Sequence, residues 1–277
     1  MAKASKLVHG DDLLYRFFQD ALQKEPELFA KVPKMMLEAM GIWFPRSIYH
    51  DLPVLLPWVV RDATCRGNKA KRLPDEWGAP NGGGYMRDDN SAVKGLPKSL
   101  SVDAPRIGSL SGARMGTEFV ASHVWRVVPG DVLASRLPLL NSFIPNLVWL
   151  PAQVAKLTDR EGQIVQRTLQ SMAHGIYRHA PVADRLVEVV EEAWAMIPEP
   201  EPIEVNDDDL NWFNVTHQWI ATRSNKLQQV VDALHTLDHG GVITTKLRPS
   251  RYRQGLPGVQ APARAELLAH LARFKAP

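Results

Sequence analysis

The sequence has few of the features that tie a chain to an oxidising compartment, to thiolate-bound metals or to a membrane. Cys65 is its single cysteine, which excludes an intramolecular disulfide and a zinc site built from several cysteines. No window approaches the roughly eighteen uninterrupted apolar residues of a membrane span. The opening residues MAKASKLVHGDDLL lack the apolar core of a signal peptide. We therefore expect a cytoplasmic protein that does not bind membranes.

Two further absences narrow the chemistry. Gly82, Gly83 and Gly84 form a glycine run, but the Lys-Ser/Thr pair that completes a phosphate-binding loop does not follow it. Because thiolate ligands are also missing, any metal ion would be held by oxygen and imidazole, which favours Mg, Mn or Ca, or a histidine-containing site.

The net charge is only +3, but it is unevenly distributed along the chain. Nine acids and no Lys or Arg lie between Leu186 and Thr222, whereas residues 240–277 hold seven Lys or Arg and one acid. A second basic cluster comprises Arg61, Arg66, Lys69, Lys71 and Arg72. Basic patches beside an acidic face favour a protein that offers one surface to a polyanion. The alternative is ordinary variation along a solvated surface.

Hydrophobic periodicity predicts helices on both sides of a less regular centre. Residues 11–41 have the spacing of two amphipathic helices, residues 219–237 that of a long helix, and residues 263–274 that of a short terminal one. Residues 61–116 are turn-rich and read as a long loop followed by short strands.

The proline-rich connector PEPEPIEV at 198–205 is the best candidate for a boundary between parts of the chain. The sequence therefore predicts an α+β protein, mostly helical, in three regions: an N-terminal helical region 1–60, a central region 61–197, and a C-terminal helical region 198–277 with a basic tail.

Two capping signals refine this prediction. Thr158 with Glu161 three residues later has the spacing of a capping box, which predicts a helix from that point through Tyr177. The segment NDDDLNWF is predicted to cap the helical run that precedes His239 and Gly240.

Two small polar groups could serve either chemistry or structure. His50 beside Asp51 is a possible acid–base pair or a structural histidine near a helix end. Asp88, Asp89 and Asn90 could bind a hard cation or form a solvated turn.

The most informative stretch is FVASHVWRVVPGDVLASRLPLLNSFIPNLVWLPAQVAKLTD, residues 119–159. An apolar run ends at His123, a turn containing Pro129 and Gly130 follows, and a second apolar run begins at Asn146. A helical pattern starts after Pro151. The pattern predicts strand, loop, strand and helix, in a module that extends over 119–180.

That order resembles the ββα-metal, or HNH, nuclease module, with SHVWR at the histidine segment and PNLVWLP at the asparagine segment. The resemblance implies a metal-dependent DNA endonuclease in which His123 is the general base and Asn146 orients the imidazole or helps to hold Mg or Mn. An imidazole suits a base that deprotonates water, and a divalent cation suits the charge that develops on phosphorus. Asp159 on the helix is a further metal ligand in this interpretation.

The sequence departs from the family's pattern at two positions. Ser122 precedes the histidine where the family often has a metal ligand, and Ala155 stands where the helix commonly supplies a His or Asn. Besides Asp159, the acids Glu118 and Asp131 lie near enough in sequence to complete a metal shell.

The leading hypothesis is a restriction-type endonuclease that cuts double-stranded DNA and acts as a homodimer. The expected DNA contacts are Arg66, Lys69, Lys71, Arg72, Arg126, Lys246, Arg248, Arg251 and Arg253. The alternatives are a non-catalytic nucleic-acid-binding protein, in the form of a degenerate nuclease, and a helical protein-interaction scaffold that uses the acidic stretch and the connector.

Overall fold

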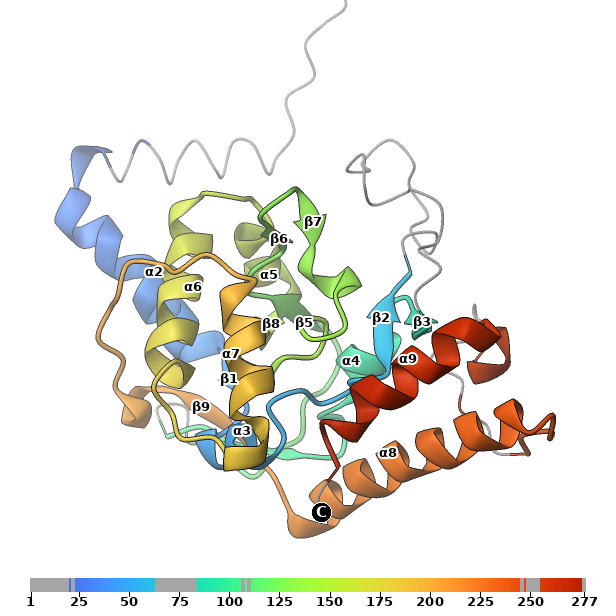
Figure 1. Ribbon diagram of the computed structural model, residues 1–277. Helices are drawn as coiled ribbons and strands as arrows, with labels where there is room; N and C mark the ends of the chain where they lie inside the picture. Colours follow the sequence, from blue (N-terminus) through green and yellow to red (C-terminus); the bar gives the residue numbers. More distant parts are fainter. Residues whose placement is uncertain are drawn as a thin grey trace, which may run out of the picture.

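The computed structural model describes residues 20, 23–62, 84–105, 108, 111–244, 247 and 255–275. These residues form a mixed α+β structure in which a five-stranded sheet is flanked by helices (Figure 1). The α+β class expected from the sequence is confirmed.

The central sheet joins distant parts of the chain. Its strands, in spatial order, are β4 (Ser101–Asp103), β9 (Asn211–Asn214), β1 (Ile42–Trp43), β8 (Leu147–Pro151) and β5 (Phe119–His123). β1 and β9 are parallel, and the other neighbours are antiparallel. Each of the three regions predicted from the sequence therefore contributes at least one strand to the same sheet.

Strand β8, between β1 and β5, is buried along most of its length. Residues Leu147 to Leu150 are all fully buried, as expected of a continuous apolar run that is covered on both faces. Phe44 and Phe213 pack against Trp149 with ring centroids 5.5 and 5.2 Å away, in edge-on geometries that aromatic pairs favour.

Helices account for most of the remaining structure. Their bounds are α2 (Pro26–Met40), α3 (Arg46–Asp51), α4 (Ser91–Gly95), α5 (Ala152–Thr158), α6 (Ile164–Tyr177), α7 (Val187–Ala195), α8 (His217–Asp238) and α9 (Ala261–Ala272). In Figure 1, α6 and α7 lie beside the sheet, and α8 and α9 lie along the lower right edge of the molecule. No helix within the described part of the chain combines the length and the apolarity that a membrane crossing requires.

The predicted strand, loop, strand and helix are all present. β5 pairs with β8 in antiparallel register, with His123 opposite Leu147, and α5 follows directly. The loop contains a small hairpin of β6 (Val127–Val128) and β7 (Val132–Leu133), which turns at Gly130 and Asp131 with positive φ. β8 also pairs with β1, so the two strands belong to the larger sheet.

The expected capping box does not start a helix. Thr158 is the last residue of α5, and its hydroxyl donates to the Ala155 carbonyl at 2.9 Å. Glu161 instead accepts from the Val127 amide at 3.2 Å and from the Gln166 side chain at 2.5 Å. The carboxylate therefore links the β6 hairpin to α6, which begins six residues after Thr158, at Ile164.

The segment NDDDLNWF is also more than a cap. Its last residues form β9, which inserts between β1 and β4. The cap of α8 is Thr216, whose hydroxyl accepts from the Trp219 amide at 3.2 Å. The predicted helix over 219–237 lies within α8 and is confirmed.

Candidate active site around His123

His123 stands at the end of β5, at the edge of the sheet. β5 is an outer strand, and its other side has no strand neighbour among the described residues. The imidazole is half-buried, and its Nε2 lies 3.0 Å from the main-chain oxygen of Asn141. Because a carbonyl can only accept, Nε2 carries the hydrogen, and in the neutral ring the Nδ1 lone pair is the basic atom.

The surroundings of this ring keep it neutral. Burial lowers the pKa of His123 to about 4, against the opposing effect of the hydrogen bond to Asn141. The positive charges of Arg61 and Arg126 lower the pKa further. Both guanidinium groups therefore lie close enough to the ring to act on its charge state.

Asn141 connects the histidine to a second strand pair. Its side-chain amide donates to the Val59 carbonyl at 2.9 Å. Val59 begins β2 (Val59–Arg61), which runs parallel to β3 (Met86–Asp88) and ends at Arg61. This bond therefore explains why Arg61, far from His123 in sequence, acts on its imidazole.

Arg126 reaches the same neighbourhood from the loop after β5. Its Nη1 donates to the main-chain oxygen of Asp159 at 2.8 Å, at the end of α5. This anchors a half-buried guanidinium three residues beyond the histidine. Arg126 is the one predicted DNA-contacting residue that lies within the described part of the chain.

Asn146 has a structural role in this arrangement. Its side chain is fully buried, with Oδ1 accepting from the Trp125 amide at 2.7 Å and Nδ2 donating to the Leu140 carbonyl at 3.0 Å. Its main-chain oxygen accepts from Val124 at 3.1 Å. Asn146 therefore fixes the two residues that follow His123.

The described hydrogen bonds of Asn146 do not include the His123 ring, and full burial separates its amide from any ion in solvent. The expected role of Asn146 as a metal ligand is therefore not supported by its contacts. Its influence on the histidine passes through the backbone.

The metal shell expected from the resemblance is not assembled by the described side chains. In that part of the chain, no three His, Cys, Asp or Glu residues gather as a metal site would require. Asp159 meets Arg126 through its main-chain oxygen. Ser122 and Ala155, at the two positions where the family has ligands, are buried at 5% and 4% exposure.

The remaining predicted DNA contacts lie outside the described residues. They are Arg66, Lys69, Lys71, Arg72, Lys246, Arg248, Arg251 and Arg253. The structure therefore neither brings them to His123 nor separates them from it.

The oxygen-rich group at Asp88 is engaged in structure. Asp88 is almost fully buried and accepts from the backbone amides of Ser91 and Ala92 at 2.8 and 2.9 Å, which caps α4. Burial, followed by the hydrogen bond with Asp89, raises the pKa of Asp88 to about 6. This carboxylate is a buried helix cap, and not the solvated turn that the sequence suggested as an alternative.

Asn141 was not among the residues that sequence reasoning singled out for the site. Asn141 orients the imidazole through its backbone carbonyl. Every residue type has this group, so the amino-acid sequence could not identify Asn141 as part of the site. Arg61 was visible only as part of a basic cluster, because its proximity to His123 depends on the placement of β2.

Comparison with known proteins does not assign the chain to a family. No protein-family model matches the chain, and searches of curated proteins and of solved structures give no match.

Proposed function

We propose that the protein is a DNA endonuclease that hydrolyses phosphodiester bonds with His123 as general base. The observation that carries the proposal is a neutral imidazole with Nε2–H held by the Asn141 carbonyl and two arginines close enough to lower its pKa. The ring has one basic nitrogen, and the guanidinium groups supply charge complementary to a phosphate.

The chemistry follows from this arrangement. Nδ1 of His123 removes a proton from water as the water oxygen attacks phosphorus. The bond from phosphorus to the leaving nucleoside oxygen breaks with its electron pair on that oxygen, which takes up a proton from solvent. Arg61 and Arg126 balance the negative charge on the phosphate oxygens. A base with a pKa near 4 is weak at neutral pH, but a bound phosphate would offset the arginine charges and raise that pKa.

A divalent cation, Mg or Mn, remains part of the proposal because the resemblance to the HNH module implies one. It would stabilise charge on phosphorus and on the leaving oxygen. The described residues supply no ligand set for it, so no catalytic step is assigned to the ion.

The test is cleavage of supercoiled plasmid with Mg, with Mn and with EDTA. The variant His123→Ala is expected to lose about 10²- to 10⁴-fold in rate, the usual contribution of a general base. The matched control is His50→Ala, because His50 is an exposed histidine that pairs with Asp51 at 2.8 Å. Cleavage by His123→Ala at the wild-type rate would refute the assignment.

A second candidate is a DNA-binding protein that has lost catalysis. The buried Ser122 and Ala155 at the family's ligand positions favour it. DNA binding that weakens steeply with salt, together with intact plasmid under every metal, would select this reading. Cleavage that depends on both the metal and His123 would exclude it.

A further inference from the structure

Helix α8 presents an unusual outer face. Its inner side packs through Trp219, Val230, Val231 and Leu234, which are buried. In Figure 1 the helix lies along the lower edge of the molecule, beside α9. Its first three turns bury few side chains besides Trp219, so most of that part of the helix faces outward.

A stripe of uncharged hydrogen-bonding side chains runs along this face. Gln218, Thr222, Asn225 and Gln229 are spaced by four, three and four residues, which places them in line on an α-helix, and all four are exposed. The side-chain amides of Gln218, Asn225 and Gln229 make no hydrogen bond to other described residues, so both their donors and their acceptors are available. Solvent-facing helices usually carry charged residues at such positions.

Two half-buried cations, Arg223 and Lys226, lie on the neighbouring row of the helix, which also holds the buried Trp219 and Val230. Arg223 stacks over the Trp219 ring at 5.8 Å, and neither Arg223 nor Lys226 pairs with a described carboxylate. The far end of α8 is different, because Asp238 there pairs with Arg264 at 2.5 Å. The first half of α8 therefore has an uncompensated positive charge, and the second half does not.

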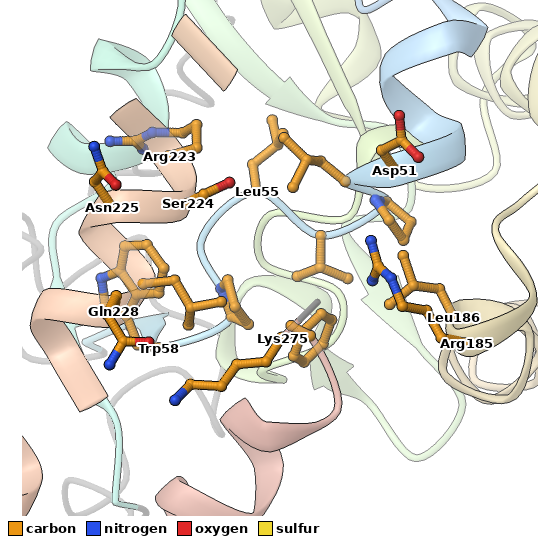
Figure 2. Close-up of a pocket in the computed structure, with 16 residues that line it drawn as sticks. Asp51, Leu55, Trp58, Arg185, Leu186, Arg223, Ser224, Asn225, Gln228 and Lys275 are labelled. Carbon is orange, nitrogen blue, oxygen red and sulfur yellow. The ribbon is translucent and has the colours of Figure 1, made fainter. Parts of the chain in front are cut away.

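Two hollows border this segment of α8. A hollow of about 320 Å³ lies between α8 and the chain around Leu55, and Figure 2 shows Arg223, Ser224 and Gln228 on its α8 side with Arg185 across from them. A second hollow of about 340 Å³ lies between α8 and α4, and Arg223 borders both.

The first hollow carries further cations at its rim. Arg185 and Lys275 line it, and neither pairs with a described carboxylate. The acid in the same lining, Asp51, pairs with His50. The start of α8 thus carries exposed side-chain amides, with Asn225 at the rim of the first hollow, and has nearby cations that pair with no described carboxylate.

We propose that the Gln218–Gln229 segment of α8 enters the major groove of B-form DNA and reads base edges through Asn225 and Gln229. An α-helix about 10–12 Å across fits a major groove about 12 Å wide. Asn and Gln can donate and accept together, which matches the edge of adenine, and Lys226 suits a flanking phosphate. This inference rests on the proposed function and assigns its sequence-reading element.

Two features favour duplex DNA over other polyanions or partners. An acidic protein would be recognised by charge, and neutral amides on the crest would add little to that. Duplex RNA has a deep, narrow major groove that side chains do not read. The exposed acid Asp232 follows Gln229 by three residues in the same line and accepts from Gln228 at 2.6 Å, so the DNA-facing segment ends at Gln229, since phosphates repel a carboxylate.

The experiment is selection of bound duplexes from a random DNA library in EDTA, followed by affinity measurements on the selected sequence across a range of salt. Asn225→Ala is expected to lose preference at one base position by roughly 5- to 150-fold, the value of one bidentate base contact. Lys226→Ala is expected to weaken binding to all sequences alike and to lower the salt slope by about one.

The matched controls are Gln23→Ala and Lys31→Ala. Both residues are exposed, and Lys31 lies on α2, on the opposite side of the molecule from α8 in Figure 1. These variants are expected to bind as the wild type does. If the wild type selects a sequence and Asn225→Ala keeps its full preference, the reading role of α8 is overturned while the proposed function stands. If the wild type binds no DNA, the proposed function itself fails.

Discussion

At the scale of single residues, the two side chains that the sequence singled out have different roles. His123 has the features of a reactive group: a fixed tautomer, a lone pair on Nδ1 and two nearby arginines. Asn146 has the features of a structural group, because full burial and backbone partners occupy its amide. The same motif thus supplies one residue for chemistry and one that holds the first in place.

The lowered pKa of His123 predicts a loss of stability in acid. In the folded protein the ring binds a proton only near pH 4, whereas in the unfolded chain it does so near its ordinary value of 6.5. Between these values the unfolded state binds more protons, so the free energy of unfolding falls as the pH falls from 6.5 to 4. Each tenfold difference in proton affinity contributes about 1.4 kcal/mol.

Urea unfolding of the wild type and of His123→Gln over this pH range measures the effect. The difference between the two curves removes the contributions of other titrating groups such as His270, whose pKa burial also lowers to about 4. The variant is expected to have the shallower pH dependence. Parallel curves would mean that the ring titrates alike in both states.

Asn146→Ala is expected to destabilise the fold by about 2–4 kcal/mol, because it leaves the Trp125 amide and the Leu140 carbonyl buried without partners. The free energy of unfolding in urea measures this. Asn214→Ala is the matched control, since Asn214 is exposed on β9. Equal stability of the two variants would show that the two hydrogen bonds of Asn146 contribute nothing.

At the scale of helices and strands, hydrophobic periodicity along the sequence predicted the elements that bury one apolar face or one apolar strand. The apolar periodicity of α2, α8 and α9 and the two apolar runs of β5 and β8 were visible in the sequence, because each buries one stripe or one strand in the core. The capping box at Thr158 was wrong, because Glu161 bonds across to the β6 hairpin. β9 was missed, because a four-residue strand depends on the strands beside it.

A close approach between elements gives a prediction at this scale. A Cβ on Gly84, just before β3, would lie 2.3 Å from the Ala263 carbonyl oxygen at the start of α9. Gly84→Ala must therefore shift α9, at a cost of about 1–3 kcal/mol for overpacking. Gly95→Ala in α4 is the control: its Cβ would meet nothing within 4 Å, so it is expected to be neutral or slightly stabilising. Thermal unfolding of both variants measures the difference in stability. Equal midpoint temperatures for the two variants would contradict the close approach of Gly84 to Ala263.

At the scale of the whole molecule, the sheet combines parts of the chain that the sequence analysis treated separately. β1, β8 and β9 come from the N-terminal, central and C-terminal regions and are hydrogen-bonded neighbours. The connector at 198–205 forms neither helix nor strand, and it leads back into this sheet. A proline-rich segment signals an extended path, and only long-range strand pairing decides where that path ends.

The sequence by itself determined the α+β class, the main helices, the strand pair with His123 and Asn146 at its ends, and the uneven distribution of charge. These are properties of periodicity and composition, which depend on neighbours along the chain. Tertiary structure alone decided that Arg61 lies near His123, that Asn146 is fully bonded to the backbone, and that the amides of α8 face outward beside unpaired cations. Such relations join residues far apart in sequence, and they arise only when packing brings those residues together.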